Sequence, residues 1–391
     1  MKVTLRTAIL KIHLWLSLAL GLLFVVICVS GSLIVFGHEI DKALNPALYR
    51  ATPGDVGFDR AHETLRGMYP GKPVSLFSPG SVVGQGVYVA WFYGEGVQVF
   101  VDPGTGAVLG SRGESESLVQ WMTTLHVDLF AGEYGFTVVG VGGILLLVVT
   151  LTGCYLWYPF VRNLALGFKV RRGRGAFLFN YDLHKVFGIL SSPPLVLIAL
   201  TGVLFVFYNF ASHAVYGLFL QKAPAQLYPD SRSLKSRPGA GGPHALAEYV
   251  RTAERELIPG ASVTYIDPPL GPEDTVKMCL KLPESPHSWG RSFVFLDQYS
   301  REPVWMRSER QMSRADSLRL NWILPLHDGS YGGVPVRALY VLVGFVPLLL
   351  SVTGLVIWQQ HRRAARVNAS RSRAVSAITR SGRPPAPTNA R

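Results

Sequence analysis

Four stretches of about 20 apolar residues recur along the chain, and two long polar segments separate them. The apolar stretches cover residues 14–36, 136–157, 186–210 and 338–358. The first carries no charged residue, and the Pro193–Pro194 pair in the third should kink a helix without ending it. A helix needs about 20 residues to cross the hydrocarbon core of a bilayer. The pattern therefore predicts an all-α membrane region of four transmembrane helices.

The first apolar stretch could be a membrane anchor or a cleaved signal peptide. Its 23 residues exceed the apolar core of a signal peptide, which has about 7–15 residues. No A-x-A cleavage site follows it. We therefore expect an uncleaved anchor.

The composition excludes several other classes of protein. Of the 391 residues, 49% are hydrophobic and 16% are charged, and the formal net charge is +13. A chain so rich in apolar residues is not disordered, and so low a charge content argues against a nucleic-acid partner. The three cysteines, Cys28, Cys154 and Cys279, lie too far apart for a metal cluster or a disulfide framework.

Positive charge is concentrated in three segments that flank the apolar stretches. The N-terminal flank, the 159–185 loop and the 359–391 tail hold 17 of the 38 Lys and Arg residues, with Asp182 as the one acidic residue among them. Positively charged flanks stay on the cytoplasmic side of a membrane. This distribution predicts a multi-pass protein with both termini in the cytoplasm, and the basic segments would also be attracted to anionic lipid of the bilayer.

The two long polar segments, 37–135 and 211–337, would then lie outside the membrane. In the first, a helical pattern at 59–68 precedes alternating strands and a turn at Asp102-Pro103-Gly104. In the second, a helical pattern at 245–257 precedes three strand-like stretches. We predict a small α+β domain in each. The full layout is 1–36 (first span), 37–135 (outer domain 1), 136–158 (second span), 159–185 (basic cytoplasmic loop), 186–210 (third span), 211–337 (outer domain 2), 338–358 (fourth span) and 359–391 (a basic, Ser/Pro/Arg-rich and disordered tail).

The two halves of the chain repeat each other. At an offset of 171, His13 matches His184 and Ser30-Gly31 matches Thr201-Gly202. At an offset of 201, Leu125-His126 matches Leu326-His327, and Thr152-Gly153 matches Thr353-Gly354. Self-similarity at a fixed spacing indicates a repeated structural unit. The predicted architecture is a duplicated two-span unit, and the Thr/Ser-Gly pairs are interpreted as points of close helix packing.

Histidines at duplicated positions are the main candidates for chemistry. His13 and His184 lie near the cytoplasmic ends of spans one and three, and His126 and His327 lie just before spans two and four. Ionisable residues at membrane depth are costly and are functional candidates. Two imidazoles from neighbouring helices can ligate a haem iron from both sides. We therefore predict two haem b groups, held by His13 with His184 and by His126 with His327.

Several alternatives stay open around this set. A histidine at a helix end is commonly just an interfacial residue, and that is the simplest interpretation of His38, His213 and His361, although any of them could replace a predicted ligand. Ser17 and Gly188, four residues after His13 and His184, would leave room for a porphyrin edge. Haem propionates need cationic partners, and the candidates near in sequence are Arg6, Lys11, Lys185 and Arg337.

With these residues the chain resembles the PepSY-associated transmembrane family, and specifically its inner-membrane di-haem ferric-siderophore reductases. The resemblance rests on the histidines and the Thr/Ser-Gly pairs named above, and on VFVDPGTGAVLGS at 99–111, which is similar to the PepSY domain signature. The second polar segment has LDQYSREPV at 296–304 instead and departs from that signature. The resemblance implies a bacterial inner-membrane oxidoreductase that reduces Fe(III)-siderophore in the periplasm.

Two other functions compete with this one. A siderophore or small-solute permease would suit duplicated halves, but the charge-free spans offer no group for ion coupling. A regulatory or sensor protein of PepSY type would use the outer domains to bind peptides or a protease. The sequence has no G-x-G-x-x-G after a strand, so a reductase would take its electrons from a quinol or a separate reductase. Trp91, Tyr93, Trp289 and Trp305 are candidate siderophore contacts, although the simplest interpretation of these aromatics is that they are core or strand-face residues.

Overall fold

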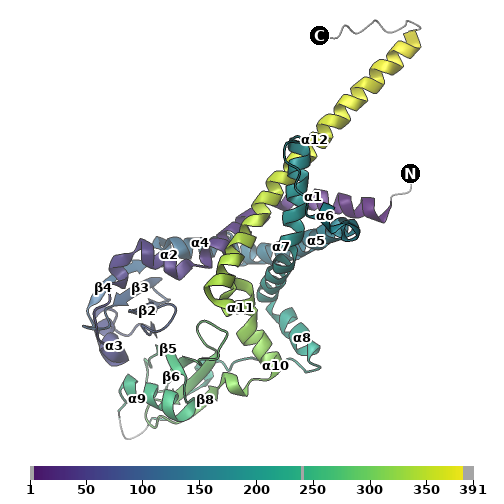
Figure 1. The fold of residues 1–391 in the computed structure, drawn as a ribbon. Helices are drawn as coiled ribbons and strands as arrows, with labels where there is room; N and C mark the ends of the chain where they lie inside the picture. Colours follow the sequence, from purple (N-terminus) through teal and green to yellow (C-terminus); the bar gives the residue numbers. More distant parts are fainter. Residues whose placement is uncertain (1–3, 239–241, 382–391) are drawn as a thin grey trace. The chain divides into compact units, whose positions relative to one another are not determined.

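The computed structural model describes residues 4–238 and 242–381 (Figure 1). The chain divides into two compact units, which we treat separately. Unit 1 draws on the segments Met1–Val25, Leu145–Val196 and Phe345–Arg391, and unit 2 on Val26–Ile144 and Leu197–Gly344.

Four helices are long and apolar enough to cross a membrane, as the hydropathy pattern predicts. They are α1 (Leu5–Ile34), α5 (Gly132–Trp157), α7 (Ala176–Val206) and α12 (Gly333–Ser381). α1 and α7 begin earlier than their apolar stretches, so that His13 and His184 each lie eight residues inside a helix. Pro193 and Pro194 lie within α7 without ending it.

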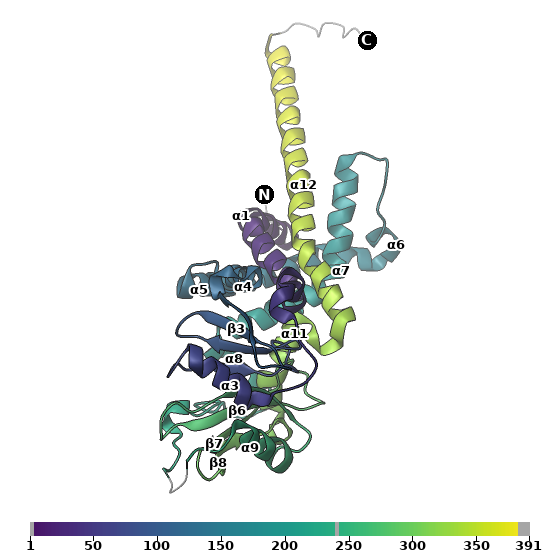
Figure 2. The ribbon, with the colours of Figure 1, turned by 90° about the vertical axis from the view of Figure 1, so that its left-hand side faces the viewer.

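The basic tail differs from the prediction. α12 continues past the apolar stretch as one helix to Ser381 (Figure 2), so residues 359–381 are helical where disorder was predicted. This part of the tail is rich in Ala and Arg, which favour helices, and it contains no Gly or Pro. The rest of the predicted disordered tail, 382–391, lies outside the described residues.

Shorter helices connect the long ones and flank the strands. α4 and α11 precede α5 and α12 and carry His126 and His327. Left-handed backbone at Leu129 and Gly329 ends both of them. The shorter α-helices are α2 (Gly37–Leu44), α3 (Gly57–Met68), α4 (Leu118–Asp128), α6 (Leu164–Gly167), α8 (Tyr208–Leu218), α9 (Leu246–Arg251), α10 (Arg314–Asp316) and α11 (Ile323–Asp328); π-helices η5 (Thr252–Leu257) and η7 (Ser317–Trp322) extend α9 and α10; and 3-10 turns are η1 (Pro46–Tyr49), η2 (Glu114–Glu116), η3 (Tyr158–Arg162), η4 (Ser231–Ser233), η6 (Glu309–Gln311) and η8 (Ser330–Gly332).

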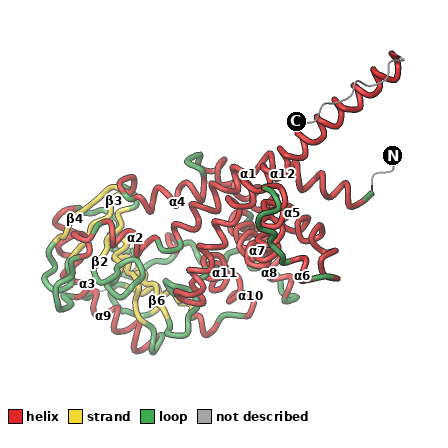
Figure 3. The backbone as a smooth tube through the Cα atoms, turned by 45° about the horizontal axis from the view of Figure 1, so that its top comes forward, coloured by secondary structure: helices red, strands yellow, loops and turns green. Residues whose placement is uncertain are grey.

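The strands of both polar segments form one antiparallel sheet in unit 2 (Figure 3) instead of the two separate domains predicted. Its order is β4-β3-β2-β1-β5-β6-β7-β8. The two halves join where Leu76 and Phe77 of β1 pair with Ile266 and Tyr265 of β5. An unpaired edge strand exposes a row of N–H and C=O groups, and this pairing covers one edge of each half. The strands are β1 (Ser75–Phe77), β2 (Tyr88–Phe92), β3 (Val97–Val101), β4 (Val108–Gly113), β5 (Ser262–Asp267), β6 (Thr275–Lys281), β7 (Ser292–Asp297) and β8 (Pro303–Arg307).

One continuous hydrophobic core also unites the two halves of the sheet. It contains Leu65 of α3, Tyr249 of α9 and strand residues such as Leu76, Ile266 and Met278, each at most 1% exposed. Burial of a large apolar side chain contributes about 1.5–3 kcal/mol. Since both segments contribute to this core, we expect neither half of the sheet to be stable alone.

The two halves end their last hairpin in the same kind of turn. Asp102 donates its N–H to the Ala107 carbonyl, and Asp297 donates its N–H to the Glu302 carbonyl. At the left-handed position of the turn the first half has Gly106 (φ 72°) and the second has Arg301 (φ 62°). The turn predicted at Asp102-Pro103-Gly104 is therefore present, and LDQYSREPV adopts it as well in spite of its different sequence.

Candidate functional site

In unit 1, His13 of α1 and His184 of α7 face each other. Their ring centroids are 6.3 Å apart and the ring planes are perpendicular, at 89°. Both side chains are half-buried. The histidines predicted as the cytoplasmic pair are thus brought together.

Each of these rings lies against a Thr-Gly pair of a neighbouring helix. His13 Nδ1 lies 3.0 Å from the Val149 carbonyl and 3.1 Å from Thr152 Oγ1 of α5. His184 Nδ1 lies 3.0 Å from Thr353 Oγ1 of α12. A Cβ added to the following glycine, Gly153 or Gly354, would meet the histidine ring at 3.3 Å.

In unit 2, His126 of α4 and His327 of α11 form a second pair. The ring centroids are 6.1 Å apart and the planes meet at 45°. His327 Nδ1 lies 3.0 Å from both Thr201 Oγ1 and the Ile198 carbonyl of α7, with Gly202 beside its ring. His126 repeats this arrangement on α1, where the Ile27 carbonyl is 2.8 Å from its Nδ1. Gly31 lies against the His126 ring, and its added Cβ would be 2.6 Å from Cε1.

These contacts fix which ring nitrogen carries the proton. A carbonyl oxygen can only accept, so His13, His126 and His327 donate from Nδ1. Thr353 Oγ1 already donates to the Leu349 carbonyl, and it therefore accepts from His184 Nδ1. Nε2 of each ring keeps its lone pair, and no hydrogen-bond partner for it occurs among the described residues. A neutral imidazole with Nδ1–H held in this way is the usual form of a metal ligand.

Burial favours the same neutral form of the imidazoles in the second pair, His126 and His327, which we call the outer pair. It lowers the pKa of His126, and burial together with the neighbouring His126 lowers the pKa of His327 to about 4. Both imidazoles are therefore uncharged at neutral pH and able to ligate a metal.

The ring spacing suits a metal ion between each pair. Two metal–imidazole bonds of about 2 Å place the facing nitrogens about 4 Å apart. The observed centroid distances of 6.3 and 6.1 Å exceed this separation by about 2 Å, which is the sum of the two distances from ring centroid to ring nitrogen. Four glycines let the rings pack directly against helix backbone, and a tetrapyrrole would supply the other ligands of an iron held by such a pair. The residues present fit a bis-histidine haem at each pair.

A family model described as the PepSY-associated TM region matches residues 10–361. The chain belongs to this family. It is also similar to Uncharacterized protein PA4219 of Pseudomonas aeruginosa, with 23% identity over 259 residues. That match covers 62% of this chain and 64% of the relative, slightly less than two thirds of the relative's length.

The other histidines of this PepSY-associated protein lie elsewhere. Among the residues that the structure describes, the histidine–histidine ring contacts are the two pairs above. His38 is on α2, where burial lowers its pKa. His213 is exposed on α8 and donates to the Asn209 carbonyl. His361, on α12, packs edge-on against Phe177 at 5.1 Å.

Three of the four predicted propionate partners bind protein groups. Arg6 donates to the Leu156 carbonyl at 3.1 Å. Lys185 is buried, 3.2 Å from Asp182 and 2.7 Å from the Leu166 carbonyl. Arg337 pairs with Glu39 at 2.6 Å. Lys11 is exposed.

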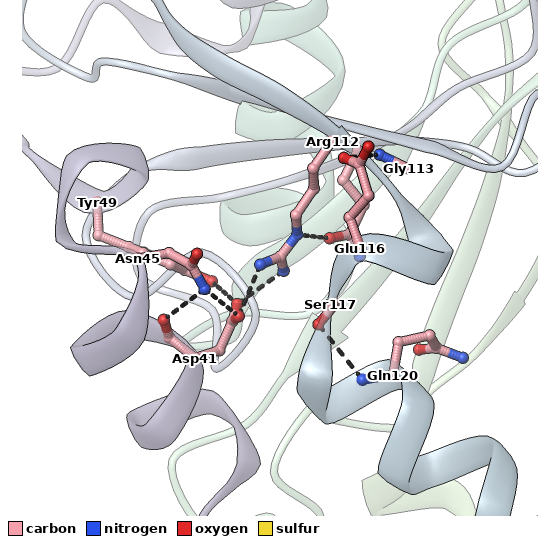
Figure 4. Close-up of polar contacts among 9 residues, drawn as sticks. Asp41, Asn45, Tyr49, Arg112, Gly113, Glu116, Ser117 and Gln120 are labelled. Atoms are coloured by element: carbon pink, nitrogen blue, oxygen red, sulfur yellow. Dashed lines mark hydrogen bonds and ion pairs between the residues drawn. The ribbon is translucent and has the colours of Figure 1, made fainter.

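A buried ion pair positions α4, a contribution that sequence reasoning missed. Arg112 of β4 makes a bidentate pair with Asp41 of α2, at 2.6 and 2.7 Å, and Tyr49 donates to the same carboxylate (Figure 4). Burial alone would raise the pKa of Asp41, but the hydrogen bonds from Arg112 and Tyr49 hold it below its ordinary value. Five residues after Arg112, Ser117 caps α4, the helix of His126. The pair therefore links the continuation of α1 to the segment that presents His126.

The Thr/Ser-Gly pairs are the second group whose role was missed. Sequence reasoning interpreted them as helix-packing positions, yet in the structure each pair or its preceding turn contacts one histidine of the four. Their offsets of 171 and 201, shared with the histidines, were the available signal.

Three of the four candidate siderophore contacts are half-buried side chains that pack on other aromatic residues. Trp91 and Trp289 pack on Phe77 in a cluster on the second face of the sheet, and Trp305 packs on Phe295. Tyr93 is 56% exposed. A separate cavity of about 910 Å³ lies between α3 and α9, a volume suited to a small ligand. Its lining includes His62, Arg66, Tyr69, His244 and Tyr299.

Proposed function

We propose that this member of the PepSY-associated family is an inner-membrane di-haem b reductase that reduces Fe(III)-siderophore in the periplasm. The observation that carries the proposal is the pairing of four histidines into two sites of matching spacing and tautomer. When bound, a haem supplies a one-electron carrier at each site. The chain's own residues bind Nδ1 of each imidazole and so leave Nε2 without a proton, available to a metal.

The contacts also support a duplicated two-span unit. His13 of α1 rests on α5 as His184 of α7 rests on α12. His126 of α4 rests on α1 as His327 of α11 rests on α7. If α1, α4 and α5 correspond to α7, α11 and α12, the helix against which each histidine lies in one half has its counterpart in the other. We infer that each half of the sheet is a PepSY-like unit and that the two share one core.

The orientation follows the charge distribution. With 17 basic residues in the N-terminal flank, the 159–185 loop and the tail, we place both termini in the cytoplasm. The sheet then lies in the periplasm. Electrons would come from a quinol or from a separate reductase, and an external ferric chelate would receive them.

Reduction would release iron because Fe(II) carries less charge than Fe(III) and is held more weakly by hard oxygen ligands. We place chelate capture at the cavity between α3 and α9, where Arg66 offers a cation to an anionic chelate. The Arg66→Ala substitution should then raise KM for the chelate several-fold with little effect on kcat. An unchanged KM would remove the cavity from the proposal.

An absorption spectrum of the detergent-purified protein, recorded before and after dithionite, tests the proposal. We expect sharp α and Soret bands of low-spin haem. These bands should be weaker in the His126→Ala and His327→Ala variants, whereas the matched control His213→Ala should keep their full intensity. A colourless, folded preparation from haem-replete cells would contradict the proposal. A proteoliposome assay with a reduced lipid-soluble donor inside and a ferric chelate outside then tests the direction of transfer.

A further inference from the structure

One buried arginine, eight residues before His327 in the chain, has no assigned role. Arg319, in η7, is 5% exposed. Its Nε lies 3.4 Å from Ser212 Oγ, and its guanidinium lies 4.1 Å from the ring centroid of Tyr208. Nη2 is buried and makes no hydrogen bond to any residue in 4–238 or 242–381. The guanidinium therefore keeps a free donor inside the protein.

The charge of Arg319 is not offset by a carboxylate. None of the ion pairs formed by the described residues includes it. Of the acids nearby in sequence, Asp316 pairs with Arg307 at 2.8 Å. Glu309 accepts from the Arg291 backbone N–H and the Asn321 amide. A buried, unpaired charge is strongly unfavourable, and the cation–π contact with Tyr208 offsets only part of that cost.

Further unsatisfied polar atoms occur in the same part of unit 2. Asn321 Oδ1 and Arg291 Nε are buried and have no hydrogen-bond partner within the described part of the chain, and Asn321 is 3% exposed. The Tyr228 hydroxyl also makes no hydrogen bond to a residue that the structure describes, and the Arg307 guanidinium lies 5.7 Å from the Tyr228 ring centroid. Buried polar groups normally have partners, so such a group of exceptions indicates a ligand.

Arg319 and His327 lie on one helical segment and both contact a second. His327 contacts Thr201 and Phe205 of α7, and Arg319 contacts Tyr208 and Ser212 of the following α8. On the other segment, η7 runs directly into α11, and Arg319 precedes His327 by eight residues. Both segments therefore lead from the histidine to the arginine.

We propose that Arg319 binds a propionate carboxylate of the haem held by His126 and His327. This inference rests on the proposed function. Guanidinium–carboxylate hydrogen bonds are strong and can be bidentate, and a propionate would supply the missing negative charge. The burial of Arg319 favours a resident group over a carboxylate of a soluble chelate. None of Arg6, Lys11, Lys185 and Arg337 is then needed at the outer site.

The test uses the full chain in the His13→Ala background, which should keep only the outer haem. Arg319→Gln and Arg319→Lys are compared with Arg310→Gln, an exposed arginine paired with Glu284. Loss of a charge-assisted hydrogen bond should speed haem transfer to excess apomyoglobin by about tenfold in Arg319→Gln. Arg319→Lys should restore most of the retention and Arg310→Gln should match the parent. The Arg319→Gln midpoint potential should also fall, because removing a positive charge stabilises the ferric form.

The outcomes separate this inference from the proposed function. Haem in the parent with an unchanged transfer rate and potential in Arg319→Gln would overturn the propionate site alone. So would a variant with normal haem retention but a raised KM for the ferric chelate, or one that loses a co-purifying phospholipid. Absence of haem from the wild-type chain would overturn the proposed function itself. If Arg319→Gln does not fold, Arg319→Met, which also removes the charge but keeps a long side chain, takes its place with the same expected transfer rate and potential.

Discussion

The first and second halves of the chain hold corresponding groups with different contacts. Arg112 and Arg307 each lie ten residues after the aspartate of a hairpin turn, yet Arg112 pairs with Asp41 of α2 and Arg307 with Asp316 of α10. Asp41 also accepts a hydrogen bond from Tyr49, and Asp316 accepts one from Tyr216. The requirement is thus a neutralised arginine at this place, and each half meets it with an acid from a different element.

The groups of α1 and α7 that contact the His126 and His327 rings, here called the two cradles, differ in a similar way. Thr201 offers a hydroxyl to His327, whereas the Ser30 hydroxyl donates to the carbonyls of Val26 and Ile27 of its own helix. The His126 ring lies closer to its glycine than the His327 ring does. The positions of the four histidines are therefore repeated more faithfully than the groups that support them.

The largest predicted effect comes from Gly31→Ala compared with Gly202→Ala. The new Cβ would lie 2.6 Å from His126 Cε1 in the first variant and 3.3 Å from His327 Cε1 in the second. The first ring has to move, and we expect loss of the outer haem; the second variant should retain it. Haem per protein, measured as the pyridine haemochrome, checks this. Equal retention in both variants would show that the two cradles are equivalent.

The next effect concerns the two arginine pairs. The Arg112 and Asp41 side chains are 10% and 7% exposed, and those of Arg307 and Asp316 are both 18% exposed. Removing one partner of a buried pair costs about 3–5 kcal/mol. Arg112→Gln should therefore lower Tm more than Arg307→Gln does. Thermal unfolding in detergent, monitored by tryptophan fluorescence, measures both Tm values. The reverse order would mean that the β4 edge of the sheet does not depend on the Asp41 contact.

A smaller effect should separate Thr201→Val from Ser30→Ala. Loss of the Thr201 hydroxyl removes a hydrogen bond of about 1 kcal/mol from His327 Nδ1. A change of that size corresponds to a few tens of millivolts in a one-electron potential. Ser30→Ala removes no bond to His126, whose Nδ1 is held by the Ile27 carbonyl. Spectroscopic redox titration should show a shift of the outer haem for Thr201→Val only.

The smallest effect concerns the left-handed positions of the two turns. Arg301 occupies in the second half the conformation that Gly106 occupies in the first. A non-glycine residue there costs about 1–2 kcal/mol, and the half-exposed Arg301–Glu248 pair returns less than about 1 kcal/mol. Arg301→Gly should leave Tm unchanged or slightly raised, and Gly106→Ala should lower it. A clear loss of stability in Arg301→Gly would assign the turn a dependence on that ion pair.

Local patterns in the sequence were sufficient for much of the molecule. Apolar length predicts the four spans, and the shared offsets of His13 with His184 and of His126 with His327 predict the pairs that the structure forms. Both features depend on residues close together in the chain or on exact repetition, and each can be found without knowledge of the fold.

Features that depend on distant contacts were not predicted. The β1–β5 pairing joins Leu76 to Ile266 across 190 residues, and no local pattern distinguishes one shared sheet from two small ones. The Thr201 hydroxyl contact to His327 depends on the rotation of α7 against α11. The helical tail was missed because its polar composition was weighed above the helix propensity of its Ala and Arg residues.

Counting haem in two single variants tests the central claim most directly. In the wild-type protein the pyridine haemochrome should give two haem b groups per chain. His13→Ala and His327→Ala should each give one, with the remaining haem still low-spin and reducible by dithionite, and His13→Ala with His327→Ala combined should give none. Two haems retained in either single variant, or no haem in the folded wild-type protein, would contradict the account.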